Sequence, residues 1–162
     1  MHRVEVVRDR HTTLGPGRVT IYDGDDVALG TFECVTGGNQ LNPRIYAGIT
    51  PPINWKVTEP IENRQHPRGH RQTMARIYPE SEEDRIEYEK GAEGKGGRTF
   101  ALDGVPFMVH AGSKRVGAST GCVAVVERWQ SFIDLFNRAY AVCQAEGGDL
   151  IVEVFDADRL DG

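Results

Sequence analysis

The first third of the chain alternates apolar and polar residues with the two-residue period of β-strands. Val4 and Val6 alternate with polar neighbours, and two later segments are rich in β-branched and aromatic residues. The turn Asp23-Gly24-Asp25-Asp26 separates those two segments, and Asp-Gly between such runs is typical of a β-hairpin. The strands expected from this pattern are residues 2–8, 18–22, 27–33 and, after a Pro-Pro pair, 53–57.

The last third combines three short apolar segments with one long amphipathic segment. Residues 127–146 place their large apolar side chains three or four positions apart, which predicts a helix with one buried face. Gly147-Gly148 follows and is expected to end that helix. Residues 105–110, 122–126 and 150–155 are expected to be strands. These patterns predict a mostly β fold of the α+β class, a compact β-sandwich or half-open barrel with one main helix.

The segment between residues 60 and 98 is polar and poorly periodic. Arginine and histidine gather in its first half, and glutamate, aspartate and glycine gather in its second half. We expect long loops here, with one or two short strands around Met74 to Tyr78. The charged runs are interpreted as solvated surface, and a lid or substrate-binding loop is the alternative.

Composition and charge narrow the classes of function. The 162 residues are 39% apolar and 27% charged, which fits a single globular domain, residues 1–162, around one core. A net charge of −5 argues against a dedicated nucleic-acid-binding protein. No apolar run has the roughly 18 residues that a membrane span needs, and the first residues lack the apolar stretch of a signal peptide. The protein is therefore expected to be made in the cytoplasm without a cleaved leader.

The three cysteines, Cys34, Cys122 and Cys143, are odd in number and widely spaced, and none belongs to a Cys-x-x-Cys pair. This spacing predicts neither a disulfide framework nor a zinc site. His66 and His70 lie four positions apart, but the Pro and Gly between them disfavour a helix that would align them. We expect no cofactor and no metal, and we expect Cys34 and Cys143 to be core residues.

Cys122 is the cysteine that is placed for chemistry. His110 ends one apolar strand, Cys122 begins the next, and 11 residues lie between them. Neighbouring strands are about 4.8 Å apart, so the two side chains can meet at one edge of a sheet. A neighbouring imidazolium lowers the pKa of a thiol, and the histidine can return the proton to a leaving group. Backbone N–H groups of Gly121 and Cys122, with the hydroxyl of Ser119 or Thr120, could stabilise an oxyanion. The alternative is a buried structural cysteine beside a hydrogen-bonded histidine.

Two segments resemble the active-site signature of the L,D-transpeptidases, the YkuD-type catalytic domain. They are Phe-Met-Val-His-Ala-Gly at residues 107–112 and Ser-Thr-Gly-Cys at residues 119–122. In that family an apolar strand ends in a His, and a loop leads to Ser-His-Gly-Cys, whose Cys is the acyl-accepting nucleophile. The helix, glycines and final strand that follow are similar to the family's order, and the resemblance spans about residues 48–155. The chain departs from the family at two positions around Cys122. Thr120 replaces the second His of the family's motif, and Ala124 replaces the Arg that is usual two residues after the Cys.

The resemblance implies one L,D-transpeptidase-like catalytic domain. Cys122 would be the nucleophile, His110 the general base, and the carbonyl of Ala111 the group that orients His110. The residues that would line the substrate and oxyanion site are Gly112, Ser119, Thr120 and Gly121.

The activity implied by the resemblance is acyl transfer on peptidoglycan stem peptides through a Cys thioester, either as L,D-transpeptidation or as L,D-carboxypeptidase hydrolysis. Small divergent members occur in phages and among toxins that bacterial secretion systems deliver, and an effector would need an immunity protein as a partner. A protein of either kind is expected to act in the periplasm or cell wall after non-classical delivery. The alternative is a non-catalytic binding or structural module, for example of a phage particle, that retains the fold.

Overall fold

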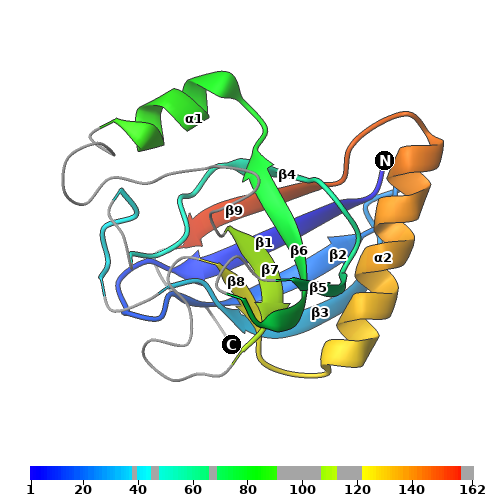
Figure 1. The fold of residues 1–162 in the computed structure, drawn as a ribbon, viewed down its shortest axis with the longest axis horizontal. Helices are drawn as coiled ribbons and strands as arrows, with labels where there is room; N and C mark the ends of the chain where they lie inside the picture. Colours follow the sequence, from blue (N-terminus) through cyan, green and yellow to red (C-terminus); the bar gives the residue numbers. More distant parts are fainter. Residues whose placement is uncertain (38–39, 45–47, 66–68, 91–106, 113–121, 158–162) are drawn as a thin grey trace.

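The computed structural model describes residues 1–37, 40–44, 48–65, 69–90, 107–112 and 122–157. These residues form one sheet of nine strands and two helices (Figure 1). The strands are β1 Arg3–Asp9, β2 Pro16–Tyr22, β3 Ala28–Val35, β4 Asn54–Val57, β5 Glu62–Gln65, β6 Arg71–Pro79, β7 Met108–Ala111, β8 Val123–Val125 and β9 Ile151–Ala157. The helices are α1 Glu82–Glu89 and α2 Trp129–Ala145.

The sheet closes on itself into a barrel. Its strand order is β4-β9-β1-β2-β3-β8-β7-β6-β5, and β4 pairs with β6 as well as with β9. This extra pairing makes a closed ring of eight strands and leaves β5 outside it. β4 and β5 lie one after the other along the same side of β6, opposite residues 77–79 and 71–74. The expected β-rich fold is confirmed, and the barrel is closed rather than half-open.

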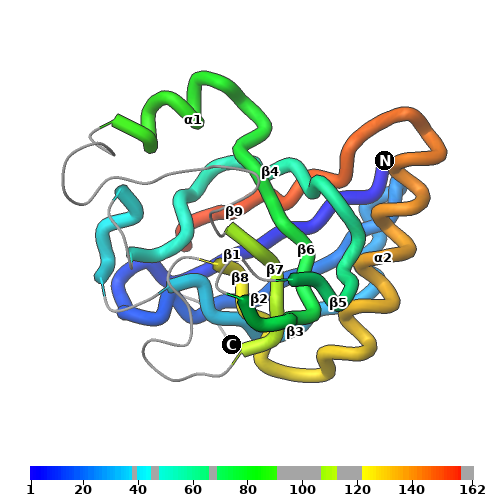
Figure 2. Tube along the Cα trace, viewed as in Figure 1, coloured from blue at the N-terminus to red at the C-terminus, as the bar shows by residue number. Residues whose placement is uncertain are grey.

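The first three strands form an antiparallel meander, as the alternating pattern predicts. At its second turn the carboxylate of Asp23 accepts hydrogen bonds from the N–H groups of Asp25, at 2.8 Å, and Val27, at 3.0 Å. An Asp side chain that bonds the backbone a few residues ahead stabilises a tight turn, so the predicted hairpin is confirmed. β9 lies parallel to β1 on the other side, which places the first and last strands next to each other (Figure 2).

The interior of the barrel is filled by alternate residues of its strands and by one face of α2. Phe132, Phe136, Ala139 and Cys143 are buried, at the spacing that the sequence predicts. Phe132 packs edge-on against Phe32 of β3, with ring centroids 5.3 Å apart. Burying a side chain of this size is worth roughly 1.5–3 kcal/mol, so this contact fixes α2 against the meander.

Helix α2 lies where the sequence predicts it and ends at the predicted glycines. Gly147 adopts a φ of 79°, and the N–H of Gly148 donates to the carbonyl of Cys143 at 2.9 Å. In the middle of the helix, the side chain of Asn137 accepts the N–H of Ile61 at 2.7 Å and donates to the carbonyl of Ile61 at 2.9 Å. These two bonds hold the connection between β4 and β5 against the helix.

The polar segment in the middle of the chain is more regular than the sequence predicts. Instead of long loops, its described part contains β5, the nine-residue β6 and the helix α1. The expected strand around Met74 to Tyr78 lies within β6. Apolar periodicity does not reveal α1, because Tyr88 is its buried residue and the rest is polar or exposed. The helix start depends instead on Ser81, whose hydroxyl accepts the N–H of Asp84 at 3.1 Å.

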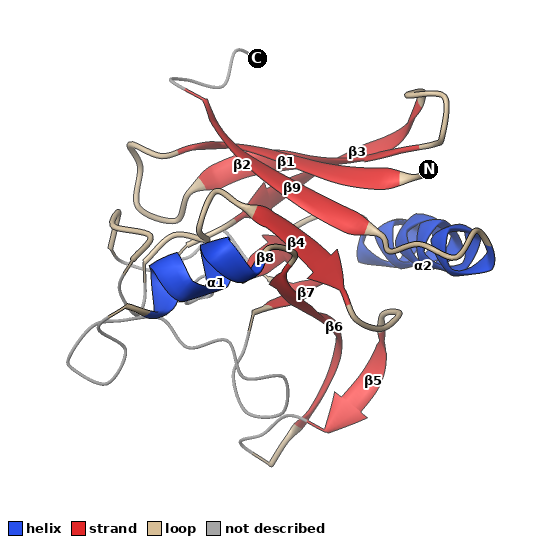
Figure 3. Ribbon diagram, turned by 90° about the horizontal axis from the view of Figure 1, so that it is seen from above, coloured by secondary structure: helices blue, strands red, loops and turns tan. Residues whose placement is uncertain are grey.

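The two helices lie on opposite sides of the barrel (Figure 3). Within the part of the chain that the structure describes, neither helix is long and apolar enough to cross a membrane.

Candidate active site

The strands that carry the candidate catalytic residues are neighbours in the sheet. β7 and β8 run parallel, with Val109 opposite Val123 and His110 opposite Ala124. Cys122 immediately precedes β8. His110, one residue before the end of β7, and Cys122, just before β8, therefore come from adjacent strands, as the sequence predicts. Because the two strands run parallel, His110 lies opposite Ala124 and not opposite Cys122.

Both candidate residues lie on the outer face of the barrel. Met74, Met108 and Cys122 form a small buried cluster that is separate from the main core. His110 lies opposite Met74 on one side and Ala124 on the other, and it is two positions from Met108. Because alternate residues of a strand share a face, this register makes Cys122 and His110 diagonal neighbours on one surface. A direct contact of the sulfur with the imidazole ring stays a prediction.

The imidazole of His110 is held by its own strand. Its Nδ1 lies 2.6 Å from the carbonyl oxygen of Ala111, the group that the resemblance implies. A carbonyl only accepts hydrogen bonds, so Nδ1 carries the proton and Nε2 of the neutral ring carries the lone pair. His110 is 6% exposed, and this burial lowers its pKa against the opposing effect of the Ala111 carbonyl. The site therefore favours a neutral histidine that can act as a base.

We expect the unfolding free energy of the wild type to fall below pH 6.5 relative to that of His110→Gln. Because the folded-state pKa of His110 lies below 6.5, the unfolded chain binds its proton more readily than the folded chain. The contribution of the neutral His110 ring to the unfolding free energy is complete above pH 6.5. It is lost as the pH falls through the lowered pKa of the folded protein. Urea denaturation of both proteins across this range measures the effect, and a difference that is constant with pH would contradict it.

The residues around the pair leave little space between β7 and β8. A Cβ added to Gly112 would lie 2.6 Å from the Cβ of Ala124, so only glycine fits there without a shift. The N–H of Gly112 donates to the carbonyl of Val125 at 3.0 Å, so this group bonds the neighbouring strand. Ala124 is fully buried. The other expected substrate and oxyanion residues, Ser119, Thr120 and Gly121, lie outside the described residues.

The other two cysteines belong to the core, as expected. Cys34 is 2% exposed and Cys143 is fully buried, and none of the three cysteines forms a disulfide. Burial raises the pKa of the Cys34 thiol to about 12, which keeps it protonated and unreactive. The sulfur of Cys143 lies 3.4 Å from the carbonyl of His2. Among the described residues, no group of three or more His, Cys, Asp or Glu side chains could hold a metal ion.

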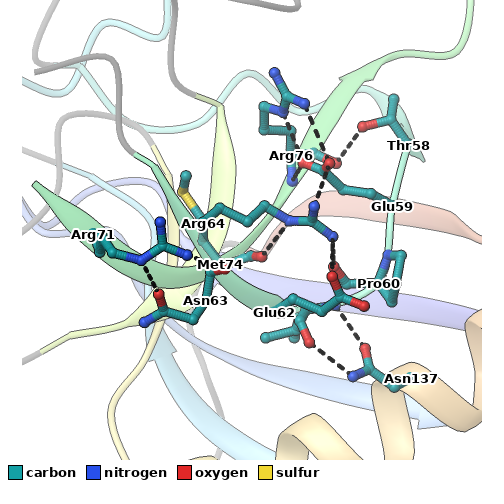
Figure 4. A network of polar contacts seen from close by, with 11 residues as sticks. Thr58, Glu59, Pro60, Glu62, Asn63, Arg64, Arg71, Met74, Arg76 and Asn137 are labelled. Atoms are coloured by element: carbon teal, nitrogen blue, oxygen red, sulfur yellow. Dashed lines mark hydrogen bonds and ion pairs between the residues drawn. The ribbon is translucent and has the colours of Figure 1, made fainter. Parts of the chain in front are cut away.

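A charged network next to this face was not predicted from the sequence (Figure 4). Glu59 accepts Nε of Arg76 at 2.7 Å and Nη2 of Arg76 at 3.2 Å, and Nη1 of Arg64 lies 3.1 Å from the same carboxylate. Arg64 also donates to the carbonyl of Pro60 at 2.6 Å and approaches that of Met74 at 3.4 Å. The basic run is visible in the sequence, but its pairing with Glu59 depends on how β4 and β5 align along β6.

Comparison of the chain with protein-family models, with curated proteins and with solved structures gives no match.

Proposed function

We propose that the protein is a cysteine acyltransferase or peptidase of the L,D-transpeptidase type that acts on peptidoglycan stem peptides. The observation that supports this most is the hydrogen bond of His110 Nδ1 to the Ala111 carbonyl, on a strand adjacent to the one that Cys122 begins. This bond directs the basic Nε2 away from its own backbone, and burial favours the neutral ring. Nucleophilic catalysis by cysteine needs a neutral, oriented imidazole within reach of the thiol, and the diagonal register of His110 and Cys122 is compatible with such a contact.

The proposed reaction has two steps, acylation of Cys122 and transfer of the acyl group. Nε2 of His110 takes the proton from the Cys122 thiol, and the thiolate attacks the carbonyl carbon of a stem-peptide bond. The tetrahedral intermediate collapses to a thioester, and the departing amine takes the proton from His110. A second amine or a water molecule then attacks the thioester with His110 as the base, which gives a cross-link or a shortened peptide and regenerates the thiol.

Burial of Cys122 and His110 limits how substrate and water reach them. Cys122 is 3% exposed, so a peptide reaches its sulfur only after a local rearrangement around it. A site that is closed to water also protects a thioester until the acceptor enters. We further propose that the substrate is met in the periplasm or cell wall after non-classical delivery, with an immunity protein as partner if the protein is an effector.

The test is to incubate the wild-type protein with a purified stem tetrapeptide that contains meso-diaminopimelate. We expect an acyl adduct on the intact protein that maps to the peptide containing Cys122, together with released D-alanine, both measured by mass spectrometry. Cys34→Ala and Cys143→Ala serve as matched controls and should acquire the same adduct per folded molecule. An adduct on Cys34 or Cys143, or a folded wild-type protein without adduct or product, would contradict the proposal.

The burial of Cys122 in a cluster with Met74 and Met108 favours one other candidate, a non-catalytic binding or structural module that retains the fold. The rate at which iodoacetamide alkylates Cys122 at neutral pH separates the two. A thiol activated by His110 reacts faster than global unfolding allows, whereas a structural thiol reacts only on unfolding.

A further inference from the structure

Three buried side chains that carry sulfur pack together on the outer face of the barrel. Met74, Met108 and Cys122 are 2%, 4% and 3% exposed and form a cluster of their own, apart from the main core. Met74 lies on β6, Met108 begins β7 and Cys122 immediately precedes β8, so three neighbouring strands supply them. The chain has three methionines, and two of their thioethers therefore meet at the one cysteine that lies outside the main core.

The sheet places a histidine beside this cluster. His110 lies directly opposite Met74 and two positions from Met108 on its own strand, so the three side chains share one face. Residues that are directly opposite on antiparallel strands have Cβ atoms about 4.5–5.5 Å apart. On the other side of β7, the parallel register puts Cys122 level with Met108. Two thioethers, one thiol and one imidazole therefore occupy adjoining positions of three strands.

The hydrogen bond of His110 suits it to bind a metal ion. Its Nδ1 lies 2.6 Å from the carbonyl oxygen of Ala111, and because that oxygen only accepts, Nδ1 carries the proton and Nε2 the lone pair. Histidines that bind metal ions almost always donate their other ring N–H to a backbone carbonyl, a carboxylate or a water molecule. Such a bond fixes the tautomer and the plane of the ring and raises its basicity as a ligand. Nε2 of His110 is therefore the nitrogen that can bind a metal ion.

The chemistry of these four side chains selects among metal ions. Thiolate and thioether sulfurs are soft ligands that favour Cu(I), whereas Mg²⁺ and Ca²⁺ are bound by oxygen. Zinc sites use thiolates, imidazoles and carboxylates, so a site in which two ligands are thioethers differs from a zinc site. Charge points the same way, because one Cu(I) ion and one thiolate cancel. A divalent ion would leave a net positive charge among buried side chains, which is costly.

We propose that this cluster is a Cu(I)-binding site whose ligands are two thioethers, one thiolate and one imidazole, those of Met74, Met108, Cys122 and His110. On binding, the thiol loses its proton to solvent and its sulfur bonds to the copper ion, so no oxidation state changes. Methionine has three rotatable bonds, which lets both thioethers turn toward an ion while the strands stay in place. Copper binding does not depend on the proposed acyl transfer, which uses Cys122 and His110 without a metal ion.

The test measures the affinity of the reduced protein for Cu(I) without oxygen, in competition with the chelator bicinchoninate. We expect one Cu(I) ion per wild-type molecule, with the ultraviolet charge-transfer absorption of a thiolate–Cu(I) bond and with sulfur as the main neighbour of copper in X-ray absorption spectra. Loss of a second-shell partner already lowers metal affinity about 10–100-fold, so loss of a ligand should cost at least as much. Met74→Leu, Met108→Leu and His110→Gln should each weaken binding by at least this factor, and Cys122→Ala should abolish the charge-transfer absorption.

Cys34→Ala and His11→Gln are the matched controls, because Cys34 lies in the main core and His11 is exposed. Both should bind Cu(I) as tightly as the wild type. Methionine and leucine are close in volume, so the two methionine variants are expected to fold, and melting curves check this. A wild type that binds no Cu(I), a folded methionine variant with wild-type affinity, or a Cys122→Ala protein that keeps the charge-transfer absorption would overturn the copper site.

Discussion

Turnover of the stem peptide is expected to fall about 10²–10⁴-fold when His110 is replaced by Gln, the usual contribution of general acid–base help. Gln is close in size to the ring and can still donate a hydrogen bond to the Ala111 carbonyl, but it has no basic nitrogen. In the proposed mechanism, the thiol of Cys122 then loses the group that takes its proton. Replacing Cys122 by Ala removes the proposed nucleophile and should abolish turnover, as measured by mass spectrometry of products.

The controls for this pair of variants are the two core cysteines. Cys34→Ala and Cys143→Ala remove atoms from the main core and should lower the unfolding free energy by about 1–2 kcal/mol while sparing turnover per folded molecule. Substantial turnover in folded Cys122→Ala would refute the assignment of the nucleophile. Unchanged turnover in His110→Gln would remove His110 from the mechanism and leave Cys122 to be activated in another way.

The largest effect on stability is expected at the buried ion pair of Arg8 and Asp156. Arg8 is fully buried, its Nε donates to Asp156 at 2.7 Å and its Nη1 lies 3.4 Å from the hydroxyl of Thr36. Nη2 has no hydrogen-bond partner among the described residues. Burial lowers the pKa of Arg8, and the hydrogen bond and charge of Asp156 act in the opposite direction to keep the guanidinium charged. Asp156→Asn should therefore cost about 3 kcal/mol, the lower end for a broken buried pair, because the Asp156 side chain is 22% exposed.

Arg8→Met distinguishes a buried charge from a general packing defect. Methionine keeps most of the volume and removes the charge, so the unfolding free energy should stay the same or rise by about 1–4 kcal/mol. In the Arg8→Met protein, the further change Asp156→Asn should lower the unfolding free energy far less than it does in the wild type. Urea denaturation at neutral pH measures all four proteins, and an Arg8→Met protein as unstable as Asp156→Asn would contradict this account.

The parts of the fold that sequence patterns predict are those in which local signals agree with tertiary contacts. The Asp23–Asp26 turn bonds its own backbone, so its hairpin is visible in four residues. The apolar face of α2 repeats over 17 residues, and the same residues pack against β3. The pairing of β7 with β8 follows from the short distance between two apolar segments, and with it the position of His110 beside the strand of Cys122.

The features that the sequence does not predict depend on distant partners. Glu59 meets Arg64 and Arg76 only because β4 and β5 follow each other along β6. Arg8 has the period of Val4 and Val6 and is buried with them, against the usual preference of arginine for water. Its partner Asp156 is 148 residues away, so no local pattern could indicate the pair.

The parallel pairing of β1 with β9 has a consequence for synthesis on the ribosome. Residues of β1 receive a neighbour that is made more than 140 positions later, since Val4 lies opposite Val152. The β1–β2–β3 meander can form early, but its β3 edge stays open until β8 is made and its β1 edge stays open until β9 emerges from the exit tunnel. At about 5–20 residues per second this interval lasts many seconds, long enough for chaperones to bind. The nascent chain is therefore expected to be most prone to aggregation just before β9 is complete.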